Sequence, residues 1–417
     1  MAPQNPPHRD RLGSSDATGD TFVLDVPGPG GSGPGVTGPA GFLAAGVAAG
    51  LKSTGKRDVA LVQNMGPRFD GAAVFTSNRV TAAPVVHSRT VIADGQVKAV
   101  VLNSGGANAC TGDGGLADAR ETGRVTADLL GTDPHDVVVC STGLIGVRLP
   151  MPTLLEGVRQ AAEALSPDGG AAAAEAIMTT DTVPKSATLT HDNGWKVGGM
   201  AKGAGMLAPG LATMLVVLTT DAVIDAGDLD TALRAASKLT FDRLDSDGCM
   251  STNDSVVALA SGASQVPASV GEMTDALVAV CGRLARMMMA DAEGAEHEIT
   301  IEVVNAATVE DAVEVARTIS RSNLFKTAIA GNDPNWGRAL AAIGTTDAEF
   351  EPDQIDVSFN GVMVCQEGGI GADRSECDLT GREVHVLVDL HAGDQSAFIL
   401  TNDLTHGYVT ENADYSS

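Results

Sequence analysis

The sequence predicts an α/β fold, and its length of 417 residues favours two domains or lobes over one core. From Phe42 onward, short apolar runs of strand length alternate with stretches of helical length. Aromatic residues make up only 3% of the chain, whereas glycine occurs 49 times. Val, Ile and Leu must therefore build the core, and small residues allow the elements to pack closely.

The N-terminal half is expected to contain strands that end in small polar turns. Residues 1–35 are polar and rich in Pro and Gly, and they are predicted to be a disordered extension. The stretch Ala44–Leu51 is small and apolar. The expected strands are Val59–Val62, Ala72–Phe75, Lys98–Leu102 and Asp136–Cys140. The expected helices cover about 115–130 and 171–178. Two of the strands run into the turns Asn103–Gly112 and Ser141–Gly146. Such turns expose N–H groups and hydroxyls where a sheet ends, so we expect them to form one wall of a site.

The C-terminal half continues the same alternation. Strands are expected at 213–219, 298–304 and 356–359, and helices at about 227–238, 271–290 and 308–321. The segment Asp333–Arg338 is expected to be a tight turn.

Charge and composition exclude several classes of function. The net charge of −26 argues against a nucleic-acid partner, because such binding needs a basic surface. The six cysteines are scattered without metal-ligand spacing, which predicts reduced thiols and no metal site. No apolar run approaches the roughly 18 residues of a membrane span, and no signal pattern stands at the N-terminus. We therefore expect a cytoplasmic protein without a membrane partner.

The segment Lys202–Thr213 is the most informative part of the chain. It is a glycine-broken loop that ends in Ala212 and Thr213, directly before the apolar run Met214–Leu218. The arrangement suits attack of the Thr213 hydroxyl on the carbonyl of Ala212, which would leave Thr213 as a new N-terminus. Its freed α-amine, with an ordinary pKa near 8, could then act as the base for its own hydroxyl. A plain loop that enters a core strand is the more common explanation of this spacing taken alone.

A threonine nucleophile also needs oxyanion donors and groups that hold the substrate. The Thr142 hydroxyl and the Gly143 N–H are candidate donors. Lys202 could pair with a substrate carboxylate, and Glu293 with a substrate ammonium, which together suit an amino acid. The alternatives are a solvated loop lysine and a surface acid.

Many motifs occur in the order found in one known family. They are Gly41–Lys52, Val74–Val85, Ser141–Gly146, Met178–Thr182, Lys202–Thr213, Ser251–Asp254, Glu293–Ala295, Lys326–Ala328, Asp333–Arg338 and Asn412–Tyr415. From about Val36 to Ser417 the chain resembles the ornithine acetyltransferases, the bifunctional glutamate N-acetyltransferases of arginine biosynthesis.

The resemblance implies a self-processing αββα sandwich of the N-terminal-nucleophile type with two lobes. Cleavage between Ala212 and Thr213 would give an α chain, 36–212, with the oxyanion-hole lobe, and a β chain, 213–417, with the nucleophile lobe. The two would associate as α2β2. The implied reaction is a ping-pong acetyl transfer through an acetyl-Thr213, from N-acetylornithine to glutamate. No cofactor is implied, although some members also use acetyl-CoA as a co-substrate.

The resemblance also assigns site residues by motif. Thr142 and Gly143 would form the oxyanion hole. Substrate contacts would come from Thr179, Thr180, Lys202, Thr213, Glu293, Asn412 and Ser417. The chain departs from the family at Gly106, at Cys249–Met250 and at Ile399–Asn402, which could alter the fit of the substrate but leaves these residues in place.

Two other functions compete with the transferase. A self-processing threonine aminopeptidase or amidohydrolase would use the same nucleophile with water as the acceptor. A binding module could use the Gly-rich stretch 27–39, although Pro29 interrupts its G-x-G-x-x-G pattern.

Overall fold

The computed structural model describes residues 22–25, 33–208 and 214–414. Most of the predicted N-terminal extension therefore lies outside the described residues, as do Ala212, Thr213 and Ser417.

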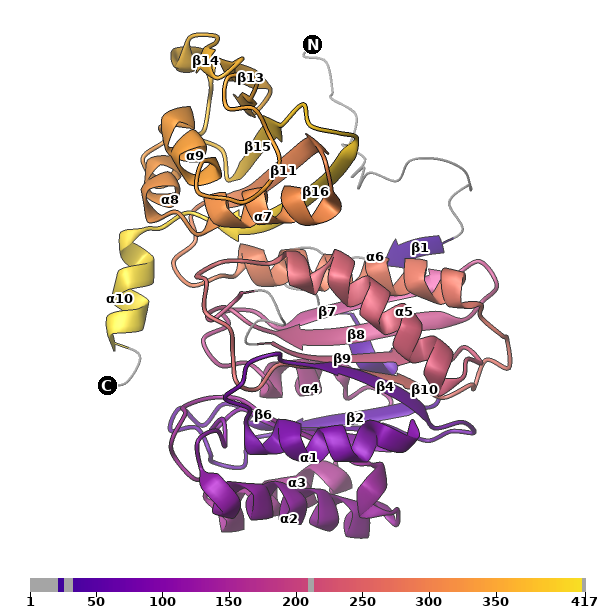
Figure 1. Cartoon of the computed structure of the whole chain (residues 1–417). Coiled ribbons are helices and arrows are strands. Elements are labelled where there is room, and N and C mark those ends of the chain that lie inside the picture. The colour runs from indigo at the N-terminus through magenta and orange to yellow at the C-terminus, as the bar shows by residue number, and fades with distance from the viewer. Residues whose placement is uncertain (1–21, 26–32, 209–213, 415–417) are drawn as a thin grey trace, which may run out of the picture.

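The first lobe is a four-layer sandwich built on two sheets (Figure 1). The main sheet has the order β1 (Phe22–Asp25), β7 (Lys185–His191), β8 (Lys196–Lys202), β9 (Leu215–Thr220), β10 (Ser255–Ala260) and β4 (Asp70–Phe75). The second sheet has the order β2 (Phe42–Val47), β3 (Val59–Asn64), β5 (Ala99–Asn103) and β6 (Val137–Ser141). Strands such as β9 and β6 are buried along their whole length, as their unbroken apolar runs predict.

Helices cover the outer face of each sheet. The main sheet carries α5 (Ala226–Leu239) and α6 (Val270–Ala290), and the second sheet carries α1 (Ala83–Val91), α2 (Gly112–Leu130) and α3 (Met151–Glu163) (Figure 1). A short helix, α4 (Gly170–Ala176), lies between the two sheets. It is rich in alanine because the space is narrow: a Cβ on Gly46 of β2 would lie 1.9 Å from the Ala172 carbonyl oxygen.

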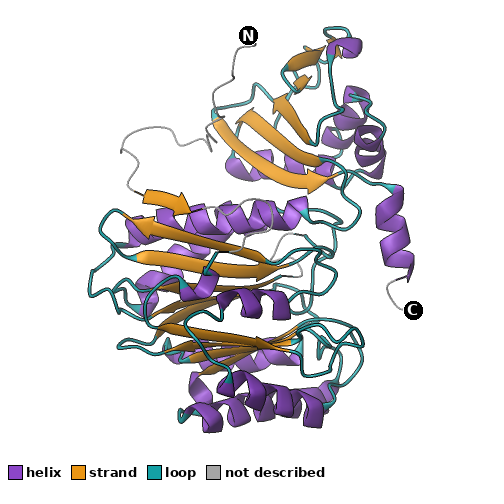
Figure 2. Ribbon diagram, turned by 180° about the vertical axis from the view of Figure 1, so that it is seen from behind, coloured by secondary structure: helices purple, strands orange, loops and turns teal. Residues whose placement is uncertain are grey.

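The second lobe is a separate sheet with helices and its own core (Figure 2). Its sheet has the order β14 (Gly369–Ile370), β13 (Val362–Gln366), β12 (Asp356–Phe359), β15 (Glu383–Asp389), β11 (Glu298–Ala306) and β16 (Gln395–Asn402). Its helices are α7 (Val309–Ser320), α8 (Asn323–Ala330) and α9 (Trp336–Ile343). After β16, the terminal helix α10 (His406–Asp414) runs back beside the first lobe (Figure 1).

Polar contacts join the two lobes. Lys326 of α8 is only 5% exposed and donates to the carbonyl of Ser246 in the first lobe. The Ser246 hydroxyl in turn donates to Oδ1 of Asn402 at 2.7 Å. The predicted motif Lys326–Ala328 therefore contributes to the contact between lobes.

The prediction of an αββα sandwich with two lobes is confirmed, and the predicted strands and helices lie within a few residues of observed ones. The expected turn at Asp333–Arg338 is wrong in part, because α9 already begins at Trp336, with the Asn335 side chain accepting from the Arg338 N–H. The segments 36–212 and 213–417 do not coincide with the lobes. Strands β8 and β9, on either side of the predicted junction, are neighbours in the main sheet.

Candidate active site

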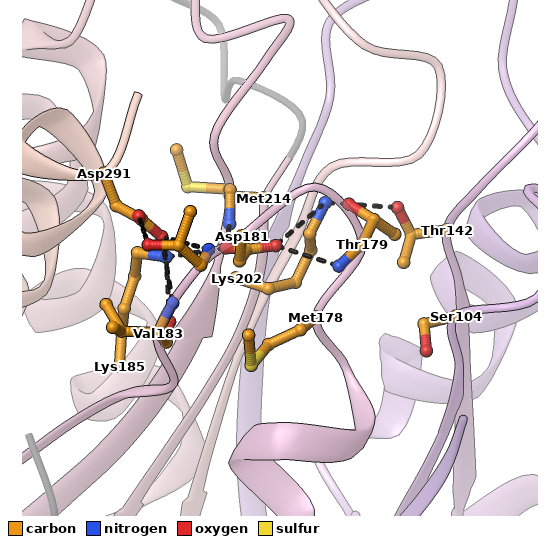
Figure 3. A network of polar contacts seen from close by, with 12 residues as sticks. Ser104, Thr142, Met178, Thr179, Asp181, Val183, Lys185, Lys202, Met214 and Asp291 are labelled. Atoms are coloured by element: carbon orange, nitrogen blue, oxygen red, sulfur yellow. Dashed lines mark hydrogen bonds and ion pairs between the residues drawn. The ribbon is translucent and has the colours of Figure 1, made fainter. Parts of the chain in front are cut away.

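The predicted oxyanion turn and the predicted lysine meet at one end of the two sheets (Figure 3). Thr142 directly follows β6, and Lys202 is the last residue of β8. Lys202 Nζ lies 3.5 Å from Oγ1 of Thr142, and each residue is only 2% exposed. An ammonium can only donate, so the Thr142 oxygen accepts from Lys202 and its own proton remains available to a substrate.

A buried network of opposite charges holds Lys202 in place (Figure 3). Asp181 lies 4.0 Å from Nζ of Lys202 and 2.7 Å from Nζ of Lys185. Lys185 also pairs with Asp291 at 2.6 Å, at the end of α6. The sequence alone left open that Lys202 is a solvated loop residue. This alternative is wrong, because Lys202 is buried.

The pKa values of these groups follow from burial and pairing. Burial alone would raise the pKa of Asp181, but the ammonium groups of Lys202 and Lys185 outweigh it and lower the pKa to about 2. Burial lowers the pKa of Lys202, while the Asp181 carboxylate opposes that shift. The network therefore keeps a negative charge on Asp181 next to the oxyanion turn.

The backbone of the oxyanion turn has a shape that requires glycine. Gly143 has φ +131°, and a Cβ there would lie 2.7 Å from the backbone N of Gly106. Gly106 N–H donates to the Thr142 carbonyl at 3.0 Å, which ties the two predicted turns together. The Asn253 side chain also bridges them, because its Nδ2 donates to the carbonyls of Ala107 and Ser141 at 2.6 and 2.8 Å.

A cleft of about 1000 Å³ opens beside this turn. Its lining includes Gly143, Ser104, Gly105, Leu51, Lys52, Lys56, Arg57, Glu175, Met178, Thr179 and Thr180. The structure thus brings Thr179, Thr180 and Gly143 together, as predicted. The Thr179 N–H donates to Oδ2 of Asp181 at 2.9 Å, so the same carboxylate orients Lys202 and this segment.

Glu293 and Asn412 lie together, and the charge of Glu293 acts on Lys202. Oε2 of Glu293 accepts from Nδ2 of Asn412 in α10 at 2.9 Å. The Glu293 N–H donates to the carbonyl of Ala204. Its carboxylate lies against Gly205, where an added Cβ would be 2.5 Å from both carboxylate oxygens. Glu293 is 9% exposed, and the alternative of a surface acid is therefore wrong.

Asp254 contacts the residue that follows the predicted nucleophile. The N–H of Met214, the residue after Thr213, donates to Oδ1 of Asp254 at 3.0 Å. Burial raises the pKa of Asp254 well above its usual value, against the effect of that N–H. The carboxyl group of Asp254 is therefore hydrogen-bonded to the residue directly after the predicted nucleophile.

Sequence reasoning missed the roles of Asp181, Lys185, Asp291 and Asn253. Asp181 lies inside the motif Met178–Thr182 and Asn253 inside Ser251–Asp254, so the motifs themselves could have pointed to these two residues. The pairing of Lys185 with Asp291 joins residues 106 positions apart, and no local pattern indicates it.

Two features are absent from the described part of the chain. No three His, Cys, Asp or Glu side chains come together there as a metal-binding group. None of the helices there combines the length and apolar character that a membrane crossing requires.

Known proteins resemble the chain over nearly its whole length. The arginine biosynthesis bifunctional protein ArgJ of Streptomyces coelicolor is 60% identical over 382 residues, which is 92% of this chain and 100% of the relative. The protein of the same name from Thermobifida fusca is 59% identical over the same shares. A crystal structure of ornithine acetyltransferase from Mycobacterium tuberculosis, complexed with ornithine, is 53% identical over 43% of this chain and 96% of that chain, with a TM-score of 0.42. The model of the ArgJ family matches residues 43–417, and the chain belongs to the ArgJ family.

Proposed function

We propose that this protein transfers an acetyl group from N-acetylornithine to glutamate, with Thr213 as the nucleophile. The observation that carries the proposal is the convergence of Thr142, Gly143 and Lys202 beside a cleft, in a chain of the ArgJ family. The products are ornithine and N-acetylglutamate, and the pathway is arginine biosynthesis.

Self-cleavage comes first in this proposal. The Thr213 hydroxyl attacks the carbonyl carbon of Ala212, and the acyl group moves from nitrogen to oxygen. Water then hydrolyses the ester, which leaves a carboxylate on Ala212 and a free α-amine on Thr213. That amine, with an ordinary pKa near 8, removes the hydroxyl proton in each later turnover.

Acetyl transfer follows in two half-reactions. The Thr213 oxygen attacks the acetyl carbon of N-acetylornithine, and the negative oxygen of the intermediate accepts hydrogen bonds from the Thr142 hydroxyl and the Gly143 N–H. The C–N bond breaks, the ornithine nitrogen takes a proton from the Thr213 ammonium, and acetyl-Thr213 remains. The neutral amine of glutamate then attacks this ester and the acyl C–O bond breaks. The proton of the attacking amine passes through the Thr213 α-amine to the Thr213 oxygen, and N-acetylglutamate leaves with Thr213 restored.

Substrate contacts follow the assignment by motif. Thr179 and Thr180 line the cleft, and Lys202 pairs with a substrate carboxylate. Glu293 with Asn412 supplies a carboxylate for a substrate ammonium. Ser417 completes the set from the end of the chain. Each of these roles is part of the proposal.

Further properties belong to the same proposal. Two αβ pairs assemble as α2β2, and the enzyme works in the cytoplasm without a cofactor. Acetyl-CoA as a second acetyl donor is part of the proposal, because the resemblance implies it for some members of the family.

The test replaces the nucleophile and measures both steps. Thr213→Ala is expected to give one uncut chain without acetyl transfer, whereas Thr213→Ser is expected to cut and retain some activity, because only Ser keeps the attacking hydroxyl. Intact mass under denaturing conditions reports cleavage, and ornithine release with and without glutamate reports the reaction. An uncut yet active Thr213→Ala protein would overturn the mechanism. Rapid acetate release without glutamate would instead indicate the threonine hydrolase.

A further inference from the structure

The chain enters the second lobe and leaves it at neighbouring points. It enters from α6 into β11 and leaves from β16 toward α10. β11 and β16 are antiparallel neighbours, with Glu298 at the start of β11 opposite Asn402 at the end of β16. The two connections outside these strands, residues 291–297 and 403–405, therefore lie side by side.

A buried histidine–aspartate pair joins the two connections. Nδ1 of His297 lies 2.7 Å from Oδ2 of Asp403, and its Nε2 lies 3.1 Å from the Leu379 carbonyl oxygen. Oδ1 of Asp403 accepts the backbone N–H groups of Glu296 and His297, both at 3.0 Å. A carboxylate that already accepts two N–H groups remains an acceptor, so Nδ1 of His297 donates to it. His297 is 6% exposed and Asp403 1%, so water competes little for these contacts.

The same two connections hold Glu293 and Asn412. Oγ1 of Thr405 donates to the Gly294 carbonyl at 2.6 Å. Gly294 has φ +64°, and an added Cβ would lie 2.0 Å from the backbone N of Tyr408, so α10 approaches as closely as only glycine allows. One turn further along α10, Asn412 donates to Glu293 at 2.9 Å. These contacts dock α10 against the segment that carries Glu293.

We propose that His297 and Asp403 are positioning residues for the substrate contacts of Glu293 and Asn412. The proposal rests on the proposed function and adds two residues to it. Asp403 is the first residue after β16, and its bonds to the other connection determine the direction in which the chain continues toward α10. His297 orients that carboxylate. A change at His297 should therefore alter the positions of Glu293 and Asn412 through the backbone.

A pair of substrates can report the position of the Glu293 carboxylate. The α-nitrogen of N-acetylornithine is acylated, so its one ammonium is on the side chain, and the proposed function pairs an ammonium with Glu293. N-acetylnorvaline has the same carbon chain without that ammonium. The ratio of kcat/KM for the two substrates therefore depends on where Glu293 lies, whereas a general loss of structure lowers both values alike.

The experiment compares three variants. His297→Leu removes both ring donors, and His297→Asn keeps a donor near the position of Nδ1. We expect His297→Leu to lower the ratio at least roughly 5-fold, because small displacements in a site are costly. The loss should appear mainly as a higher KM for N-acetylornithine, since the ammonium contact is made in the ground state and the transition state alike. His297→Asn should recover part of the ratio.

His385→Leu is the matched control. His385 makes a contact of 2.8 Å with the Glu302 carboxylate in the same lobe, but both side chains are exposed. The control should change the ratio by no more than about 2-fold. Complete cleavage by intact mass shows that a variant has folded, and His297→Phe, a ring without donors, takes the place of His297→Leu if the latter stays uncut.

Each outcome decides between roles. Equal losses for both substrates in His297→Leu would show that the pair only stabilises the fold, and the proposal would fall. An unchanged ratio would also overturn it. Identical ratios in His297→Asn and His297→Leu would exclude the hydrogen bond to Asp403 as the cause.

Failure of the proposed function is separable, because it would appear as absent acetyl transfer in the unmodified protein. Hydrogen exchange of the amides in α10 then tests the docking without turnover. Exchange should be at least roughly 5-fold faster in His297→Leu than in the unmodified protein, and unchanged in His385→Leu, because a loosened helix opens more often. Equal exchange in all three proteins would exclude the positioning role.

Discussion

Asp181 connects several residues of the candidate site. It is fully buried, faces two lysines, and accepts N–H bonds from Thr179 and Gly203. Buried charges are costly to desolvate, and a buried pair is strongly destabilised when one partner is removed. Asp181 is therefore a positioning residue for Lys202 and for the threonines of the cleft.

Replacing Asp181 should show this dependence in stability. We expect Asp181→Asn to lower the free energy of unfolding by about 3–5 kcal/mol, because it leaves two buried ammonium groups without their shared carboxylate. Denaturant unfolding at neutral pH measures the change. Asp128→Asn is the matched control, since Asp128 pairs with Arg124 on the exposed face of α2 and should cost less than about 1 kcal/mol. Equal effects of the two variants would contradict the assigned role.

The same carboxylate predicts a pH dependence. Its folded pKa of about 2 lies below its ordinary value of 3.8, so its contribution to stability is complete above about pH 4 and is lost as pH falls toward 2. The difference in unfolding free energy between the unmodified protein and Asp181→Asn should shrink across that window. A difference that stays constant from pH 5 to pH 2.5 would argue against the paired, ionised state.

At the scale of elements, the turns after β5 and β6 form one wall of the candidate site. β6 ends in the Thr142–Gly143 turn, β5 ends in the turn with Gly106, and a backbone hydrogen bond connects the two turns. Parallel pairing of β5 and β6 puts both carboxyl ends at the same edge of the sheet. The oxyanion turn is thus supported by its neighbour rather than by its own sequence alone.

Gly143→Ala tests that support. The added Cβ would meet the backbone N of Gly106 at 2.7 Å, so the turn must shift and its N–H must leave the oxyanion position. We expect kcat for acetyl transfer to fall about 10²–10³-fold, as when an oxyanion donor is lost. Gly146→Ala is the control, because Gly146 has φ +86° in the same segment but nothing within 4 Å of its added Cβ. Similar rates for both variants would remove Gly143 from the oxyanion hole.

At the scale of the whole molecule, the main sheet contains strands from both sides of the predicted cleavage point. β8 pairs with β9 from Lys202 opposite Leu215 to Val197 opposite Thr220, and β10 continues the sheet on the other side of β9. The core between the two sheets likewise combines residues from before and after the junction, such as Val100, Met200, Val217 and Val257. The segments before and after the predicted junction therefore share one hydrophobic core and one sheet.

The cleaved chains should therefore stay associated without denaturant. We expect an affinity tag on residues 213–417 alone to retain the other chain in equal amount, because separation would expose a sheet edge and two core faces. Elution of cleaved protein at the same volume as uncut Thr213→Ala is the second readout. Recovery of separate chains under native conditions would contradict the arrangement of the sheet.

Local sequence was sufficient for much of this protein. Unbroken apolar runs predicted β5, β6 and β9, and the small polar residues after β5 and β6 predicted the wall of the site. Turn chemistry pointed to Thr142 and Gly143, and charge pointed to Lys202 and Glu293. The roles of Thr213, Ala212 and Ser417 stay predictions, because these residues lie outside the described part of the chain.

Only the tertiary structure determined which charged side chains are buried and paired. β8 contains Gly198 and Gly199, which weaken the strand pattern, so it forms because β7 and β9 supply its hydrogen bonds. That pairing buries Lys202 near Asp181, which comes from a different segment of the chain. Residue type specifies which charges a chain carries. Long-range strand pairing and burial determine which of these charges form ion pairs inside the protein and which stay accessible.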